Sequence, residues 1–108
     1  MVHGGAGSRI AAARRALLRR HLDAVCDEAY AYLRTHSALE SVVWAVERLE
    51  DDPLFNAGTG SVLQADGRAW MSAAVMDGAR GRFGGVLNVE RVRHPVRVAR
   101  ALLNGPDR

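Results

Sequence analysis

Few side chains in this sequence could do chemistry on their own, and those few are widely spaced. The histidines are His3, His21, His36 and His94, and the single cysteine is Cys26. Their spacings match none of the patterns by which histidine and cysteine hold zinc. A cysteine nucleophile needs surroundings that lower its pKa, whereas Cys26 stands among apolar residues in a helical pattern. We therefore expect Cys26 to be structural and the histidines to lie at the surface or at helix ends.

The glycine-rich and acidic stretches do not complete an active site either. Residues 58–62 do not fit the G-x-S-x-G turn that presents a serine nucleophile. Residues 5–10 lack the third glycine of a dinucleotide-binding turn, and a chain without lysine cannot have a G-x-x-x-x-G-K-[ST] phosphate loop. The acidic residues 50–52 could hold a cation, although a short acidic run is usually solvated. No nucleophile is therefore paired with a base within this sequence.

The positive charge comes entirely from arginine. All fifteen basic residues are arginines, and the net charge is +3. The clusters are Arg14, Arg15, Arg19 and Arg20 near the start and Arg91, Arg93, Arg97 and Arg100 near the end. A basic cluster can bind nucleic acid, but aromatic residues are only 6% of the chain and do not alternate with the arginines. We interpret both clusters as solvated helix faces and predict no nucleic-acid partner.

The length predicts that residues 1–108 are one small domain or a piece of a larger one, without a second domain. No apolar run approaches the roughly eighteen residues of a membrane span, and the N-terminus lacks the basic and apolar regions of a signal peptide. One cysteine cannot form an internal disulfide, which favours a reducing compartment. We therefore expect a cytoplasmic chain with no membrane partner.

Two helices are predicted in the first half. Apolar residues recur every three or four positions over residues 9–36, on a face formed by Leu18, Leu22, Val25, Ala29 and Tyr32. Ser37 and Glu40 make a capping box that begins a second helix, and Pro53 marks its end. The apolar stripe of that helix comprises Leu39, Val42, Val43, Val46 and Leu49.

The second half predicts strands and a last helix. Residues 52–60 read as an ordered loop, because proline, asparagine and glycine punctuate them. Strands are expected at residues 61–64, 68–76 and 84–92, with an Asp66-Gly67 hairpin turn after the first. Residues 69–76 are almost all apolar or small, which predicts a strand covered on both faces. Pro95 begins the last helix, and Asn104-Gly105-Pro106 ends it.

Together these elements predict a layered α/β (α+β) fold in which helices cover an antiparallel sheet. The sheet is incomplete, because strands that are apolar on both faces need more protein to bury them.

Six short motifs follow one another along the chain. They are residues 3–7 (HGGAG), 49–63 (LEDDPLFNAGTGSVL), 65–67 (ADG), 74–78 (AVMDG), 84–86 (GGV) and 93–95 (RHP). Together they resemble the plant-type asparaginase/isoaspartyl peptidase family, and residues 49–63 are the most specific part. Two positions depart from the usual pattern: Ser72 stands where aspartate is usual, and His94 where asparagine is common.

The resemblance implies that this chain is the front of the α subunit of an N-terminal nucleophile hydrolase, whose fold is an αββα sandwich. A precursor in that family cuts itself, and the new N-terminal threonine of the β subunit attacks asparagine or an isoaspartyl peptide bond. Its own α-amine acts as the base, and an oxyanion hole stabilises the intermediate. This implies a small-molecule or dipeptide substrate, a β-subunit partner and an (αβ)2 assembly, with no catalytic residue in this chain.

The resemblance assigns supporting roles to residues that are present. Gly4 and Gly5 match flexible glycines near the cleavage site, and Asn56 matches an asparagine that braces the loop beside the nucleophile. The residues that match a sodium loop would bind through main-chain carbonyls, and they are Leu49, Glu50, Asp52, Phe55, Ala57 and Thr59. Oxygen ligands suit such a hard cation. No organic cofactor is expected, and the alternative for this loop is an ordered turn without an ion.

Two hypotheses follow for the chain as a whole. The first is the N-terminal portion of an amidohydrolase for asparagine, isoaspartyl peptides or both, inactive without its nucleophile. The second is a truncated, inactive relative that acts at most as a small binding or structural module. The sequence does not decide between the two substrates.

Overall fold

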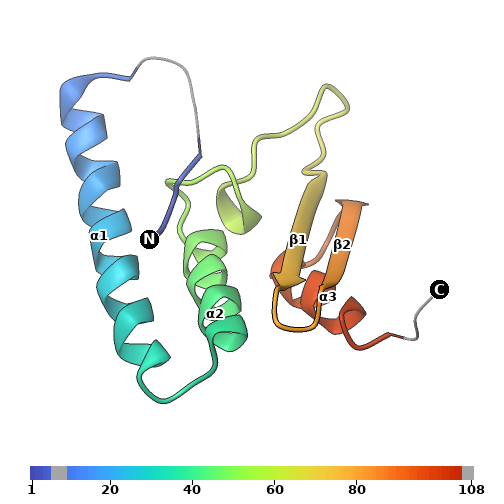
Figure 1. Ribbon diagram of the computed structural model, residues 1–108. Helices are drawn as coiled ribbons and strands as arrows, with labels where there is room; N and C mark the ends of the chain where they lie inside the picture. Colours follow the sequence, from blue (N-terminus) through green and yellow to red (C-terminus); the bar gives the residue numbers. More distant parts are fainter. Residues whose placement is uncertain (6–9, 106–108) are drawn as a thin grey trace.

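The computed structural model describes residues 1–5 and 10–105. In chain order, its elements are α1 (Ala12–Leu33), α2 (Ala38–Asp51), a short 3-10 turn η1 (Gly58–Gly60), β1 (Met71–Asp77), β2 (Arg82–Val89) and α3 (Pro95–Leu102) (Figure 1). Over these residues no helix is both long enough and apolar enough to cross a bilayer.

The two long helices form an antiparallel hairpin, with α1 lying along α2 (Figure 1). The cluster between them consists of Val25, Ala45, Leu49 and Phe55, with Val2, Leu18, Leu22, Ala29 and Leu54 packed around it. The apolar face predicted for the first helix is therefore the packed one. The helix itself is shorter than the predicted residues 9–36; Arg9 lies outside the described residues, and the last turn ends at Leu33.

Helix α2 begins with the predicted capping box. The Ser37 hydroxyl accepts a hydrogen bond from the Glu40 N–H at 3.2 Å, and Glu40 Oε2 accepts one from the Ser37 N–H at 3.0 Å. Two backbone donors that the helix leaves unpaired are thus satisfied. The bonds from the Ser37 hydroxyl and N–H hold the pKa of Glu40 below its usual value.

The predicted apolar stripe of α2 is only partly buried. Val43 and Leu49 are buried, whereas Val42 is 52% exposed and Val46 is 36% exposed. The apolar stripe of α2 therefore predicts a larger buried face than the described residues form.

Strands β1 and β2 pair antiparallel through the tight turn at residues 78–81, and α3 lies against one face of this pair (Figure 1). Val75 faces Gly84 across the ladder, and both lie on the side of α3. The core of this half consists of Val43, Val75, Val96, Ala99 and Leu103. An α+β fold with an antiparallel sheet under helices is thereby confirmed.

The strand boundaries differ from the predicted ones. The strand predicted at residues 84–92 is β2, which runs from Arg82 to Val89. Beyond its end, Arg91 adopts a left-handed φ of 58°, which departs from strand geometry. A strand at residues 61–64 was the wrong prediction. Gln64 N–H donates to the Arg68 carbonyl at 2.8 Å, which closes the predicted turn, but Val62 and Leu63 are mostly exposed and pair with no strand in the described chain.

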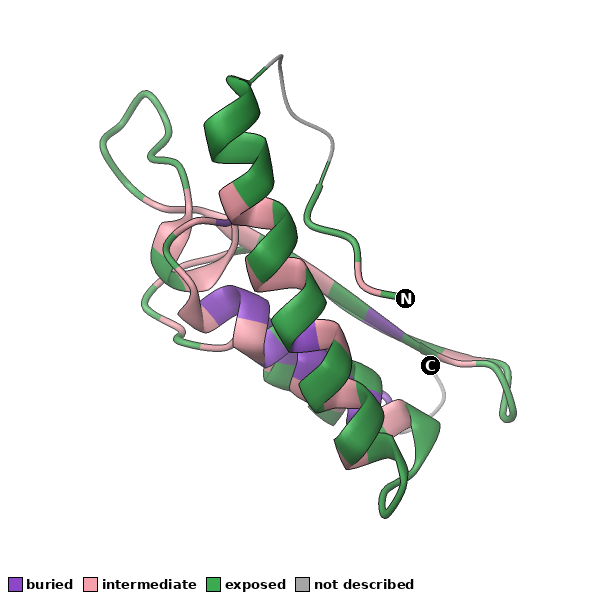
Figure 2. Cartoon of the chain, turned by 90° about the vertical axis from the view of Figure 1, so that its left-hand side faces the viewer, coloured by how far each residue is buried: buried purple, intermediate pink, exposed green. Residues whose placement is uncertain are grey.

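The face of β1 and β2 turned away from α3 is open. Met76, Phe83 and Leu87 are exposed by 65%, 69% and 81%, so the prediction that residues 69–76 are covered on both faces is wrong for this chain. The molecule is a slab of 45 × 40 × 20 Å with a radius of gyration of 14.8 Å, whereas a compact chain of this length has about 13 Å. Exposed residues likewise follow the outer side of α1 (Figure 2).

Candidate functional site

The predicted supporting residues come together at the C-terminal end of α2. Residues 49–59 run from the last turn of α2 through a tight loop into η1, so all six predicted carbonyl ligands lie in one continuous turn of chain. Phe55 is 5% exposed and anchors this loop in the core under α1. We call residues 52–61 the α2–η1 loop.

The sequence explains why α2 stops here with carbonyls left over. Helix carbonyls near a C-terminus normally accept from the N–H four residues later. Pro53 has no N–H for the Leu49 carbonyl, which accepts instead from the Asp52 N–H at 3.3 Å. The Leu54 N–H, which would serve the Glu50 carbonyl, donates to Asp52 Oδ1 at 2.9 Å. The helix end thus presents carbonyl oxygens that are short of donors.

Short-range hydrogen bonds wind the loop that follows. The Phe55 N–H donates to the Asp52 carbonyl at 3.2 Å, and the Ala57 N–H donates to the Phe55 carbonyl at 2.9 Å. The Gly60 N–H then donates to the Ala57 carbonyl at 3.0 Å. A carbonyl oxygen has two lone pairs, so each of these acceptors keeps capacity for a second partner.

Two glycines allow the carbonyls to crowd inward. A Cβ at Gly58, whose φ is +51°, would lie 2.3 Å from the Glu50 carbonyl oxygen. A Cβ at Gly60 would lie 2.1 Å from the Phe55 oxygen and 2.7 Å from the Pro53 oxygen. Only glycine fits where backbone approaches backbone this closely. The loop therefore holds main-chain oxygens close to the backbone of η1 at the negative end of a helix, and we call this arrangement the cradle. Oxygens are the ligands that a hard cation prefers.

The acidic side chains beside this cradle are directed to other elements. Asp52 Oδ2 lies 2.6 Å from His21 Nδ1 on α1, and Asp51 Oδ1 accepts from Arg93 Nε at 3.1 Å. Glu47 pairs with Arg97 on α3. Within the described part of the chain, no three His, Cys, Asp or Glu side chains gather as a metal site. The residues present fit a cation only through main-chain oxygens.

Glu50 makes the deepest of these contacts. Its side chain is almost fully buried, Oε1 accepts from the Val96 N–H at 3.0 Å, and Oε2 lies 3.3 Å from His94 Nδ1. Burial raises the pKa of Glu50, while the Val96 N–H and His94 oppose that rise. The carboxylate thus caps the first turn of α3. The sequence analysis did not predict this role of Glu50. The available signal was the three-residue spacing of Glu47 and Glu50, which places both carboxylates on one face of α2.

The N-terminal glycines lie against the same loop. A Cβ at Gly4 would lie 2.8 Å from Phe55 Cε1 and 3.2 Å from Leu22 Cδ2, so only glycine lets the N-terminal turn pack this closely. Gly5 has a φ of +96°, which favours glycine as the sequence predicts. The structure therefore places Gly4 beside Phe55 of the α2–η1 loop, although the two are about fifty residues apart in sequence.

Asn56 lies on the exposed side of this loop. Its Oδ1 accepts a hydrogen bond from the Val62 N–H at 2.9 Å. That bond ties the start of the loop to the segment that leaves it. The role predicted for Asn56, bracing the loop beside a nucleophile, stays a prediction.

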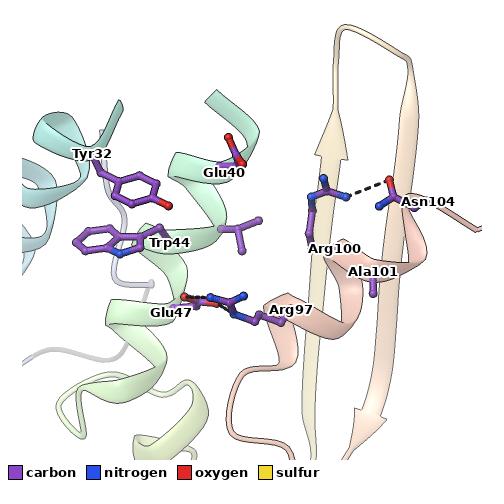
Figure 3. A pocket seen from close by; sticks show the side chains of 9 residues that line it. Tyr32, Glu40, Trp44, Glu47, Arg97, Arg100, Ala101 and Asn104 are labelled. Carbon is purple, nitrogen blue, oxygen red and sulfur yellow. Dashed lines mark hydrogen bonds and ion pairs between the residues drawn. The ribbon is translucent and has the colours of Figure 1, made fainter. Parts of the chain in front are cut away.

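A second concave site lies between α2 and α3 (Figure 3). Its volume is about 360 Å³, and Tyr32, Trp44, Glu47, Arg97 and Arg100 are among the residues that line it. The Arg97 guanidinium is paired with Glu47, which raises the pKa of Arg97, and Arg100 donates to Asn104 Oδ1 at 3.2 Å. Glu40 also lines the groove, so two acidic side chains offset the two arginines and the groove has no net formal charge.

Comparisons with known proteins agree with this architecture. A family model described as asparaginase matches residues 1–107. An isoaspartyl peptidase/L-asparaginase from Nostoc sp. is 51% identical over 100% of this chain and 35% of its own length. A plant-type L-asparaginase from Pyrobaculum calidifontis is 44% identical over 99% of the chain and 36% of its own length. An isoaspartyl peptidase/L-asparaginase from Rattus norvegicus is 41% identical over 95% of the chain and 31% of its own length.

The chain belongs to the asparaginase family, whose members among these relatives are isoaspartyl peptidases and plant-type L-asparaginases. It spans about a third of the length of the curated relatives it matches.

Proposed function

We propose that residues 1–108 form the front portion of an amidohydrolase that acts on L-asparagine, on isoaspartyl peptides or on both. The observation that carries this proposal is the match of the entire chain to relatives that bear both names, at up to 51% identity in those compared above. The loop geometry supports it, since Gly4 packs closely on Phe55 of the α2–η1 loop.

The chemistry would come from an N-terminal threonine outside this chain. Among the described residues, the pairing that most resembles a nucleophile with its base is Thr35 Oγ1 and His36 Nδ1, 2.9 Å apart. Both side chains are exposed, and each also lies within hydrogen-bond reach of the Tyr32 carbonyl. They thus satisfy the end of α1, with no third group to orient the imidazole as a triad requires. The chain alone is expected to be inactive.

The supporting site would bind a sodium ion in the α2–η1 loop. The ligands proposed are the main-chain oxygens of Leu49, Glu50, Asp52, Phe55, Ala57 and Thr59. The support is the donor shortage at the end of α2 and the crowding of carbonyls around Gly58 and Gly60. The ion would stabilise the loop that Asn56 braces, and through Phe55 the turn at Gly4.

The partner we propose is the β portion that carries the threonine, within an αββα sandwich and an (αβ)2 assembly. The uncovered residues Met76, Phe83 and Leu87 support it, because a large exposed apolar patch usually marks an interface. Nucleic acid is not proposed as a partner. Arg14, Arg15, Arg19 and Arg20 are all exposed near the start of α1, as a solvated helix face requires.

The test is complementation. The chain would be produced alone and together with the complementary two thirds of the Nostoc relative, and ammonia release from asparagine and cleavage of β-aspartyl dipeptides would be measured. We expect no turnover by the chain alone and turnover of at least one substrate by the complex. An assembled complex with a free N-terminal threonine that cleaves neither substrate would refute the substrate assignment. Turnover by the isolated chain would refute its inactivity.

A further inference from the structure

Glu50 contacts both α3, through its side chain, and the α2–η1 loop, through its main chain. Its side chain is 3% exposed and reaches 46 residues along the sequence to the Val96 N–H at 3.0 Å, in the first turn of α3. Its main-chain carbonyl faces Gly58, where a Cβ would come within 2.3 Å of the oxygen. One residue therefore joins the docking of α3 to the shape of the α2–η1 loop.

The side-chain bond limits how the carbonyl can turn. The helix end gives the Glu50 carbonyl little restraint of its own, because the Leu54 N–H donates to the Asp52 side chain instead. The carboxylate, by contrast, is held by Val96 and lies 3.3 Å from His94 Nδ1, with Pro95 and Val96 buried around it. Fixing the side chain fixes the main chain from which the carbonyl projects.

We propose that Glu50 is a positioning residue for the cation cradle: its side chain, anchored on the Val96 N–H of α3, orients the loop oxygens, so that cation binding and this Glu50–Val96 bond strengthen each other. The inference rests on the sodium site proposed above and adds a residue whose side chain is no ligand. Coupling of this kind is reciprocal: whatever strengthens one interaction must strengthen the other by the same factor. Residues that hold ligands in place commonly change metal affinity by roughly 10- to 100-fold when altered.

The experiment measures the sodium concentration that half-saturates the folded chain, obtained by fitting the rise of stability with sodium concentration to the relation RT ln(1 + [Na⁺]/Kd). The chain is melted in mixtures of sodium chloride and choline chloride at constant ionic strength, so that general screening does not change. A ligand that binds only the folded state raises its stability as concentration exceeds the dissociation constant. The variants are Glu50→Ala, which removes the carboxylate, and Glu50→Gln, which keeps an oxygen that can accept from Val96.

We expect Glu50→Ala to raise the half-saturating sodium concentration at least tenfold, and Glu50→Gln to change it less than threefold. The matched control is Arg97→Ala. It breaks the Glu47 pair between the same two helices, one turn away from the cradle. Arg97→Ala is expected to lower the melting temperature and leave the sodium dependence unchanged. If Glu50→Ala does not fold, Glu50→Asp, whose shorter side chain draws back from Val96, takes its place with the same expectation.

The possible outcomes distinguish this proposal from the sodium site and from the hydrolase assignment. Glu50→Ala could lower stability equally in sodium and in choline and keep the wild-type half-saturating sodium concentration. Glu50 would then be only a structural residue and the inference would be wrong, while the sodium site would stand. If the unaltered chain melts identically in both salts, the sodium site and this inference both fail. The hydrolase assignment would still be judged by the turnover of the complemented complex.

Discussion

The two faces of the β1–β2 pair are built from alternate residues of the same strands, yet they have opposite surroundings. On the inner face, Val75 and Gly84 lie against α3, and the residues there are buried. On the outer face, Met76 and Phe83 are paired across the ladder and are mostly exposed. Side chains on a strand alternate between the two faces. The sequence makes both faces apolar, but among the residues that the structure describes, a helix covers only one of them.

The largest expected effect comes from filling the inner face at Gly84. A Cβ there would lie 2.3 Å from the Ala99 carbonyl oxygen, so Gly84→Ala must push α3 off the sheet. We expect a loss of about 3 kcal/mol in the free energy of unfolding, measured by urea denaturation followed by far-UV circular dichroism. The matched control is Gly85→Ala on the outer face, where the nearest atom is Phe83 Cε1 at 3.1 Å on an exposed ring. Equal losses for both variants would contradict the difference between the faces.

A second change addresses the outer face. Phe83→Ser is expected to alter the stability of the chain alone by no more than about 0.5 kcal/mol, because the ring is 69% exposed. In the complex with the complementary polypeptide, the same change should weaken association by about 2 kcal/mol, since a buried aromatic ring is lost. Association is measured by titration calorimetry. An unchanged affinity would mean that this face stays uncovered in the complex.

A third change weakens the helix layer without touching either face of the sheet. Ser37→Ala removes the hydroxyl that accepts from the Glu40 N–H and should lower stability by about 1 kcal/mol. Ser72→Ala is the control, because the Ser72 hydroxyl is exposed and only accepts from the Asn88 N–H at a long 3.4 Å. Urea denaturation of both variants decides; a Ser72→Ala loss as large as that of Ser37→Ala would be evidence against the capping role.

The smallest effect is a pH dependence of the same cap. The Ser37 hydroxyl and N–H lower the pKa of Glu40 below its usual value near 4.5. A lowered carboxylate pKa stabilises the folded state above the unfolded value and stops doing so as pH falls through the folded value. The stability difference between the wild type and Glu40→Gln should therefore be present at pH 7 and shrink below about pH 4.5. A difference that is constant from pH 7 to pH 3 would exclude an ionised cap.

Local signals in the sequence were sufficient for the helices. The capping box at Ser37, the proline at residue 95 and the three-to-four spacing in α1 each act within one or two turns, and the structure confirms them. The expected strand at residues 61–64 failed for a related reason. Asp66 binds the Arg68 N–H and the Trp70 indole N–H locally, which closes a turn without any neighbouring strand to extend the ladder.

The candidate site also contains local features that the sequence can suggest and long-range contacts that it cannot. The loop, its glycines and Asn56 form a contiguous motif, so the sequence alone could name them as candidates; their roles stay predictions. The contacts of Glu50 with Val96 and of Asp52 with His21 span 46 and 31 residues, and nothing local to either partner specifies the other. The acidic run was predicted to be a candidate ligand set or a solvated stretch. Instead, Glu50 and Asp51 contact residues 93–96 at the start of α3, and Asp52 contacts His21 on α1.

The aromatic contacts of the helix hairpin make its packing observable by optical methods. Tyr32 lies parallel to Trp44 with ring centroids 5.2 Å apart, His36 stacks on the other side of Tyr32, and Arg48 lies over the indole. An indole held in one asymmetric environment gives a near-UV circular dichroism band, which disappears when side chains lose fixed packing while helices persist. The chain thus has an intrinsic spectroscopic marker that distinguishes a properly packed hairpin from a merely helical one.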